Sequence, residues 1–134
     1  MNRKSGRPLS PHLTIWKWGP NMLVSILHRA TGVGLATVGA ALFVWWLAAA
    51  ASGPESYQAF LDCIGGPVMY WIMLVVGVGL TWAAFQHVYS GLRHFVLDTG
   101  AGYELRTNKF WSTMTIVGSV LTTGLIWAYL IWGR

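Results

Sequence analysis

Charged residues are scarce in this sequence, and their scarcity excludes an ordinary soluble domain. Of 134 residues, nine are Lys or Arg and four are Asp or Glu, whereas 54% are hydrophobic. Soluble domains carry about 25% charged residues, so this composition is typical of a membrane protein. Three stretches contain no charged residue, namely 30–54, 63–92 and 110–133. Each is longer than the roughly 20 helical residues that cross the apolar core of a bilayer.

Cysteine is almost absent, and this excludes two further features. The single residue, Cys63, cannot form a disulfide within the chain, and no Cys-x-x-Cys-His sequence is present for covalent attachment of a c-type haem. The basic residues near the N-terminus are not followed directly by a short apolar region, so we expect no cleaved signal peptide. The first apolar run is therefore expected to remain in the protein as its first membrane anchor.

The fold class predicted from the apolar runs is all-α, integral to the membrane, with three transmembrane helices. The proline-rich basic segment 1–20 is expected to be a cytoplasmic arm on the membrane surface, and 21–134 to be the transmembrane domain. The segment 52–62 is predicted to be the first loop, and 99–108 a short polar turn. The transmembrane helices are expected at about 22–51, 66–98 and 109–132.

The distribution of basic residues predicts which side of the membrane each end occupies. Only Arg134 falls on the side opposite the N-terminus. The positive-inside rule therefore places the N-terminus in the cytoplasm, in keeping with a bacterial inner membrane. Contact with anionic lipid headgroups explains the net charge of +5, so nucleic-acid binding is not expected. The basic residues assigned to the cytoplasmic side are Arg3, Lys4, Arg7, Lys17, Arg29, Arg93, Arg106 and Lys109.

The second apolar run ends in a cluster of ionisable residues, which is the main candidate for a functional site. His87, Gly91 and His94 are spaced i, i+4 and i+7, so a helix places them on one face with a notch at the glycine. The notch could admit a flat ring, and a neutral imidazole is a common ligand of haem iron. His87 is the expected ligand, because an ionisable residue inside a membrane span is by default a functional candidate.

A haem at His87 could point its propionates at a basic rim. Arg29 enters the first helix from the cytoplasmic side and His94 leaves the second helix toward it, so His28, Arg29 and His94 are candidates to pair with the propionates. Only His87 lies deep within a span, so a second axial ligand is expected from another subunit. Other roles stay open, since a membrane histidine can hydrogen-bond to a neighbouring helix and an arginine can anchor a helix at the surface.

Three motifs, taken in order, resemble the cytochrome b membrane-anchor subunit of succinate dehydrogenase, the larger of its two hydrophobic subunits. The resemblance covers nearly the whole chain, including the three spans and the cytoplasmic N-terminus. The motifs are specific in combination, although His-x3-Gly alone would be weak. They are Arg7-Pro8-Leu9-Ser10-Pro11-His12-Leu13-Thr14-Ile15, then Ser25-Ile26-Leu27-His28-Arg29 with Thr31-Gly32, then His87-x3-Gly91-x-Arg93-His94-x3-Asp98.

The resemblance implies a respiratory assembly with four kinds of subunit. A flavoprotein would oxidise succinate, an iron-sulfur subunit would relay the electrons, and two anchor subunits would complete a helical bundle that holds a non-covalent haem b and reduces quinone. By motif match, His87 is the axial haem ligand and the companion anchor supplies the other. The same match puts His28, Arg29 and His94 near the propionates, and makes Ser25 and Arg29 quinone-binding residues. The quinone is expected to be ubiquinone, with menaquinone as the alternative.

Two other functions stay open on the sequence. The chain, which is not expected to be catalytic alone, could be a haem-free anchor that only docks the soluble enzyme. It could instead be a small proton or cation transporter with His87 and His94 as a relay. A b-type spectrum in the purified complex would exclude the first of these functions. Ion flux into liposomes that contain this chain alone would indicate the second.

Overall fold

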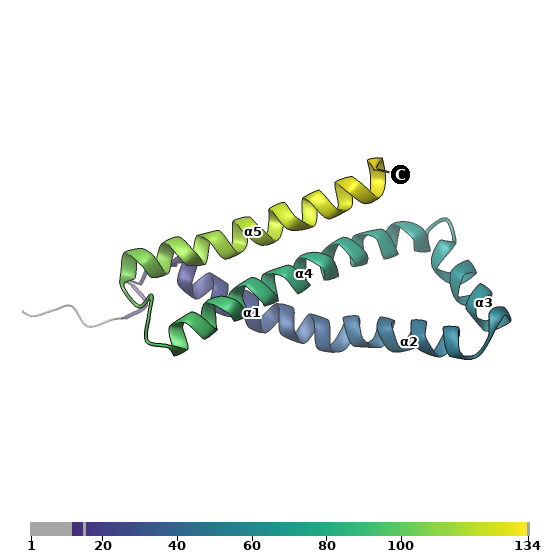
Figure 1. Cartoon of the computed structure of the whole chain (residues 1–134), viewed down its shortest axis with the longest axis horizontal. Helices are drawn as coiled ribbons and strands as arrows, with labels where there is room; N and C mark the ends of the chain where they lie inside the picture. Colours follow the sequence, from purple (N-terminus) through teal and green to yellow (C-terminus); the bar gives the residue numbers. More distant parts are fainter. Residues whose placement is uncertain (1–11, 15, 134) are drawn as a thin grey trace, which may run out of the picture.

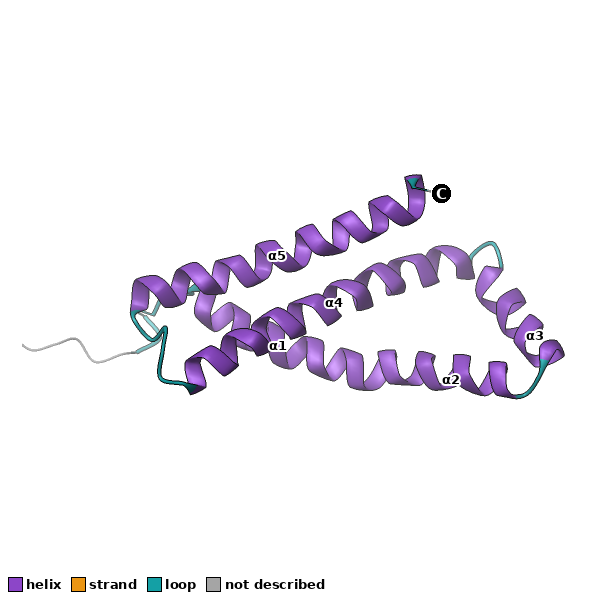
Figure 2. Cartoon of the chain, in the orientation of Figure 1, coloured by secondary structure: helices purple, strands orange, loops and turns teal. Residues whose placement is uncertain are grey.

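Helices make up nearly all of the structure, a computed structural model that describes residues 12–14 and 16–133 (Figures 1 and 2). In that part of the chain there is no strand. The first span is continuous, although a π-helical turn interrupts its α-helical hydrogen bonding. In order, the elements are α1 (Pro20–Gly34), the π-turn η1 (Leu35–Gly39), α2 (Ala40–Ala51), α3 (Pro54–Gly65), α4 (Met69–Asp98) and α5 (Leu105–Trp132).

Three of these helical stretches are long and apolar enough to cross a membrane. They comprise 32, 30 and 28 residues, beginning at Pro20, Met69 and Leu105. At about 1.5 Å per residue, each is longer than the roughly 30 Å apolar core of a bilayer. The predicted all-helical fold with three membrane-spanning helices is therefore confirmed.

The predicted loop at 52–62 is wrong, because most of it forms the helix α3. Gly53 adopts a φ of +103°, a conformation that favours glycine, and Pro54 then occupies the first turn of the helix. Gln58 donates a hydrogen bond of 2.9 Å from Nε2 to Oδ1 of Asp62 one turn later. The ring of Phe60 packs on that of Trp45 in α2, with centroids 4.7 Å apart. α3 thus bridges the far ends of α2 and α4 (Figure 1).

The third span also begins earlier than predicted. α5 starts at Leu105, within the stretch expected to be a polar turn, and the backbone amide of Asn108 donates to the carbonyl of Glu104 at 2.8 Å. The turn before it contains Gly100 and Gly102, both with positive φ. The charge-free run begins only at residue 110, whereas the helix includes the polar residues that precede it.

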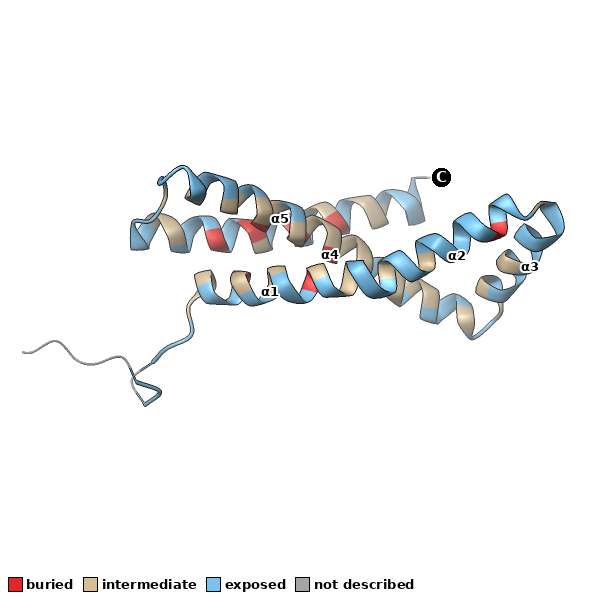
Figure 3. Cartoon of the chain, turned by 90° about the horizontal axis from the view of Figure 1, so that it is seen from below, coloured by how far each residue is buried: buried red, intermediate tan, exposed pale blue. Residues whose placement is uncertain are grey.

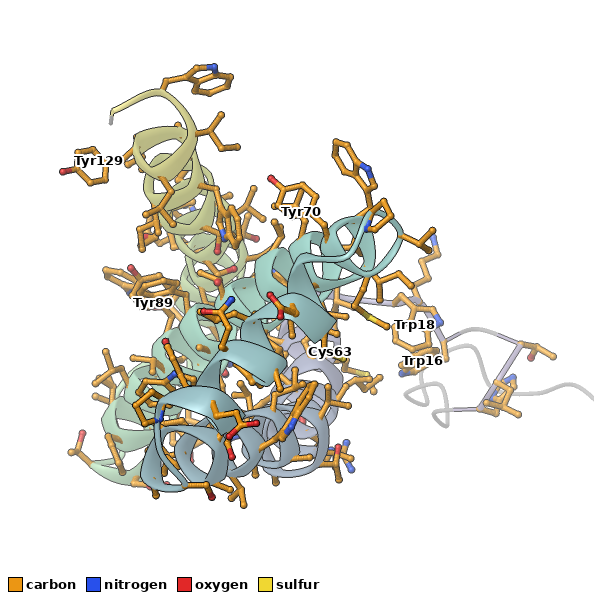
Figure 4. All side chains as sticks on the ribbon, turned by 90° about the vertical axis from the view of Figure 1, so that its right-hand side faces the viewer. Trp16, Trp18, Cys63, Tyr70, Tyr89 and Tyr129 are labelled. Atoms are coloured by element: carbon orange, nitrogen blue, oxygen red, sulfur yellow. The ribbon has the colours of Figure 1, made fainter. Side chains whose placement is uncertain are left out.

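Basic residues gather at one end of the molecule, where α1 and α5 begin and α4 ends (Figure 1). Most of the predicted arm, including Arg3, Lys4 and Arg7, lies outside the described residues, as does Arg134. Trp16 and Trp18 lie together just before α1, with ring centroids 5.0 Å apart (Figure 4). The basic residues that the structure describes are Lys17, Arg29, Arg93, Arg106 and Lys109.

The interior between the helices is polar, whereas the surface is apolar. Among the described residues, the buried hydrophobic side chains are few and small, while most large ones are exposed on the outside (Figure 3). Lipid offers no hydrophobic drive to bring helices together, so membrane interfaces use small and hydroxyl-bearing residues. The buried polar residues are Thr31, Gln86, Ser90, Ser112, Thr115, Ser119 and Thr123.

One of these polar contacts predicts an asymmetric pair of mutational effects. The hydroxyl proton of Ser119 in α5 is shared between Oε1 of Gln86 in α4, at 2.8 Å, and the carbonyl of Ile116 in its own helix, at 2.9 Å, while Nε2 of Gln86 has no partner. Ser119→Ala would leave both ends of this buried amide unpaired and should cost about 1 kcal/mol. Gln86→Met removes both polar atoms at similar volume and should be nearly neutral. The thermal unfolding midpoints of the two purified variants, measured in the same detergent, test this difference in stability. An equal drop in midpoint for Ser119→Ala and Gln86→Met would contradict the prediction.

Candidate functional site

Three histidines from two helices meet between α1 and α4, toward the end where α1 begins and α4 ends. The imidazoles of His28 on α1 and His87 on α4 are stacked, with centroids 4.0 Å apart and planes inclined by 10°. The ring of His94, two turns further along α4, contacts His28 edge to face at 5.1 Å. The structure thus brings together all three histidines that the sequence singled out.

Glycines make room for two of these rings. A Cβ atom at Gly32 of α1 would lie 2.9 Å from Cε1 of His87, which is closer than such atoms approach. A Cβ atom at Gly91 of α4 would lie 3.8 Å from Cε1 of His28. The notch expected at Gly91 between His87 and His94 is therefore occupied by the imidazole of His28. Each ring lies against a glycine of the opposite helix.

Hydrogen bonds fix the tautomer of His87. Its Nδ1 lies 3.1 Å from the backbone carbonyl oxygen of His28 and 3.3 Å from Oγ1 of Thr31. A carbonyl oxygen only accepts, so Nδ1 carries the proton and Nε2 keeps its lone pair. Thr31 can accept from the same N–H, because its own hydroxyl donates to the carbonyl of Leu27 at 2.7 Å. His87 thus has the form in which an imidazole binds a metal through Nε2.

A cavity of about 320 Å³ lies beside the histidines, toward the basic end of the bundle. Ser25 and Arg29, one helical turn apart on α1, both line it, and His94 contributes from α4. His28 and His87 are not among its lining residues, so His94 is the link between the stacked rings and the cavity. His28 and Arg29 are neighbours in sequence and point about 100° apart around the helix, which separates them into these two places.

Arg93 and Asn108 are among the cavity's lining residues that were not assigned to it from the sequence. Arg93, interpreted as a possible surface anchor, lines the cavity and donates a hydrogen bond of 2.6 Å from Nη2 to Oδ1 of Asn108 in α5. Asn108, near the start of α5, lines the cavity as well. The arginine is thus held in place by a partner from another helix.

A larger cavity of about 430 Å³ lies between α4 and α5. Apolar side chains such as Leu92, Val96 and Trp111 dominate its lining, and none of the predicted site residues belongs to it. The chemistry expected from the sequence therefore concentrates on the histidine stack and the smaller cavity.

Three membrane-length helices that enclose a buried polar interior define an integral membrane protein. Residues 3–126 match the family described as the succinate dehydrogenase/fumarate reductase transmembrane subunit, and the chain belongs to that family. The match includes every residue of the histidine stack and of the smaller cavity.

Relatives from bacteria and mitochondria are similar over most of their length. The succinate dehydrogenase cytochrome b556 subunit of Paracoccus denitrificans is 35% identical over 118 residues, which cover 88% of this chain and 87% of the relative. The subunit of the same name from Rickettsia conorii is 35% identical over 121 residues, 90% of each chain. The mitochondrial cytochrome b560 subunit of Mus musculus is 34% identical over 125 residues, covering 92% of this chain and 71% of the relative.

Proposed function

We propose that this chain is the haem-binding membrane anchor of a succinate:quinone oxidoreductase. The observation that carries the proposal is the state of His87, whose Nδ1–H donates to the carbonyl of His28 and whose Nε2 lone pair is left for a metal. The names of the relatives, which contain cytochrome b556 or b560, support haem as the group that carries the metal. In the described part of the chain, no group of three His, Cys, Asp or Glu side chains is arranged for a bare ion.

The residues present fit haem b held by one imidazole of this chain. His87 would supply one axial ligand through Nε2, and a companion anchor subunit the other. His28 lies next to His87, and His94 lies next to His28, so both could contact the propionates; Arg29 is one residue further along α1. When bound, the haem supplies one-electron redox chemistry at the membrane end of the enzyme.

The cavity beside the histidines is the proposed site of quinone reduction. Ser25 and Arg29 would donate hydrogen bonds to a quinone oxygen and stabilise the negative charge that develops on it. The electrons would come from succinate through a flavoprotein and an iron-sulfur subunit. Ubiquinone is the favoured acceptor, and menaquinone is the alternative. We place the basic end of the bundle in the cytoplasm of a bacterial cell, facing those soluble subunits.

Purification of the intact complex tests this proposal. Flavoprotein and iron-sulfur subunits should co-purify with the chain, and the dithionite-reduced minus oxidised difference spectrum should show a b-type haem. A complex that reduces quinone but lacks that spectrum would overturn the haem assignment and favour a structural anchor. Proton or cation flux into liposomes containing the chain alone would instead favour a transporter.

The contact between Gly32 and His87 predicts a specific loss of haem. Gly32→Ala places a methyl group 2.9 Å from Cε1 of His87, so the ring must move and its bond to the carbonyl of His28 must lengthen. We expect a lower haem content per flavin in the purified complex. Gly34→Ala is the matched control, because nothing lies within 4 Å of a Cβ atom there. Alanine raises helix propensity at both positions, so a loss of haem in Gly32→Ala alone would come from the contact with His87. Wild-type haem content in both variants would contradict the predicted effect of that contact.

A further inference from the structure

Ser90 is a fully buried hydroxyl in the α4 face that meets α1. Its Oγ lies 2.6 Å from the carbonyl oxygen of Gln86 and 2.7 Å from Nδ1 of His28. The hydroxyl has one proton, and the carbonyl oxygens of Gln86 and, at 3.1 Å, His87 can only accept it, so we assign Oγ as the acceptor of a hydrogen bond from Nδ1–H of His28. Ser90 therefore holds the edge of the His28 ring from the neighbouring helix and fixes which nitrogen carries the proton.

This bond is one half of a reciprocal pair between the two helices. His28 of α1 donates to Ser90 of α4, while His87 of α4 donates to the carbonyl of His28. Between the two bonds the imidazoles stack at 4.0 Å with nearly parallel planes. A ring clamped at its edge offers its neighbour a fixed face, so the plane of His87 is defined both by its own bond and by the surface of His28.

We propose that Ser90 is a positioning residue that acts through His28 to set the orientation of the His87 imidazole. The motifs that marked the histidines do not include Ser90. The inference deepens the proposed haem function, because the plane and basicity of an axial imidazole are set by groups outside the metal's own ligands. Its structural part, the Ser90–His28 contact, does not require haem.

Ser90→Ala in the intact complex tests the proposal. We expect the ¹⁵N spectrum of histidine-labelled complex, reduced so that the haem is diamagnetic, to lose the single protonated-Nδ1 pattern of His28. In the oxidised complex, the low-spin haem EPR signal should shift and broaden as the His87 plane becomes less defined. Ser90→Thr keeps a hydroxyl and should restore both signals toward wild type.

Ser112→Ala is the matched control. Ser112 is also fully buried, but its hydroxyl donates to the carbonyl of Asn108 within its own helix. It should therefore leave the histidine signals and the EPR signal unchanged. In a His28→Phe background, Ser90→Ala should add no further EPR shift, because the intermediary is gone.

The outcomes separate this inference from the haem proposal. Unchanged ¹⁵N and EPR signals in a folded Ser90→Ala complex would overturn the positioning role. An equal shift in Ser112→Ala, or the same shift with and without His28, would show a general packing effect and overturn it too. A complex without haem would refute the proposed function, and the ¹⁵N measurement would still test the bond between Ser90 and His28.

Discussion

His87→Ala is expected to remove haem from the assembled complex, or to leave a weakly bound haem with a lowered midpoint potential. The substitution deletes the imidazole whose Nε2 is free to bind iron, and it also breaks the bond from Nδ1 to the carbonyl of His28. One ligand in a low-dielectric site cannot be replaced by water at equal strength. Haem per flavin and a redox titration of the difference spectrum measure the effect. Assembly with the companion anchor should weaken as well.

His94→Ala serves as the comparison for this result. His94 contacts His28 edge to face and lines the smaller cavity, so its loss should cost a contact at the haem periphery rather than an iron ligand. Haem content should stay near wild type, with a modest shift in potential. If His87→Ala retained the wild-type spectrum and potential while His94→Ala lost haem, the axial ligand would be His94 and the assignment from the tautomer would be wrong.

The spans could be predicted because they depend on composition along the chain. A charge-free run long enough to cross a bilayer has few structures open to it other than a membrane-spanning helix, and the three long helices lie at those runs. α3 was missed for the same reason: with Asp62 and Glu55 and no long apolar run, its sequence offered only weak local signals, of which Gly53-Pro54 was the best. Such a helix is set by its Gly53-Pro54 start and by packing on Trp45 rather than by hydropathy.

The site could be predicted only as far as one helix determines it. The i, i+4, i+7 spacing correctly put His87, Gly91 and His94 on one face, but it could not say that the ring of His28 would occupy the space beside the glycine. That outcome depends on how α1 crosses α4. The reciprocal fit of Gly32 to His87 likewise needs both helices.

Residues that support other side chains were the hardest to predict from the sequence. Ser90 and Thr31 are small hydroxyls of the kind that commonly bond back to their own helix, and both do so here. Their second role, toward His28 and His87, becomes visible only when the opposite helix is in place. Asn108 joined the cavity because α5 begins before the predicted residue and packs against the end of α4.

Substitutions in the smaller cavity should separate two activities of the same enzyme. Succinate oxidation measured with an artificial acceptor at the soluble subunits does not use the membrane pocket, whereas quinone reduction does. Ser25 and Arg29 line the pocket from one face of α1, and Arg29 already bonds back weakly to the carbonyl of Ser25 at 3.4 Å. A guanidinium so placed is free to turn toward a quinone oxygen.

Arg29→Leu should lower quinone reduction about ten- to a hundredfold, because a hydrogen bond to developing charge commonly contributes ~1.5 to 3 kcal/mol. Ser25→Ala removes an uncharged donor and should cost less. Arg106→Leu is the matched control, since Arg106 is exposed and does not line the cavity. If Arg29 also reaches a propionate, Arg29→Leu alone should shift the haem potential. Wild-type quinone reduction in both cavity variants, with assembly intact, would place the quinone site elsewhere.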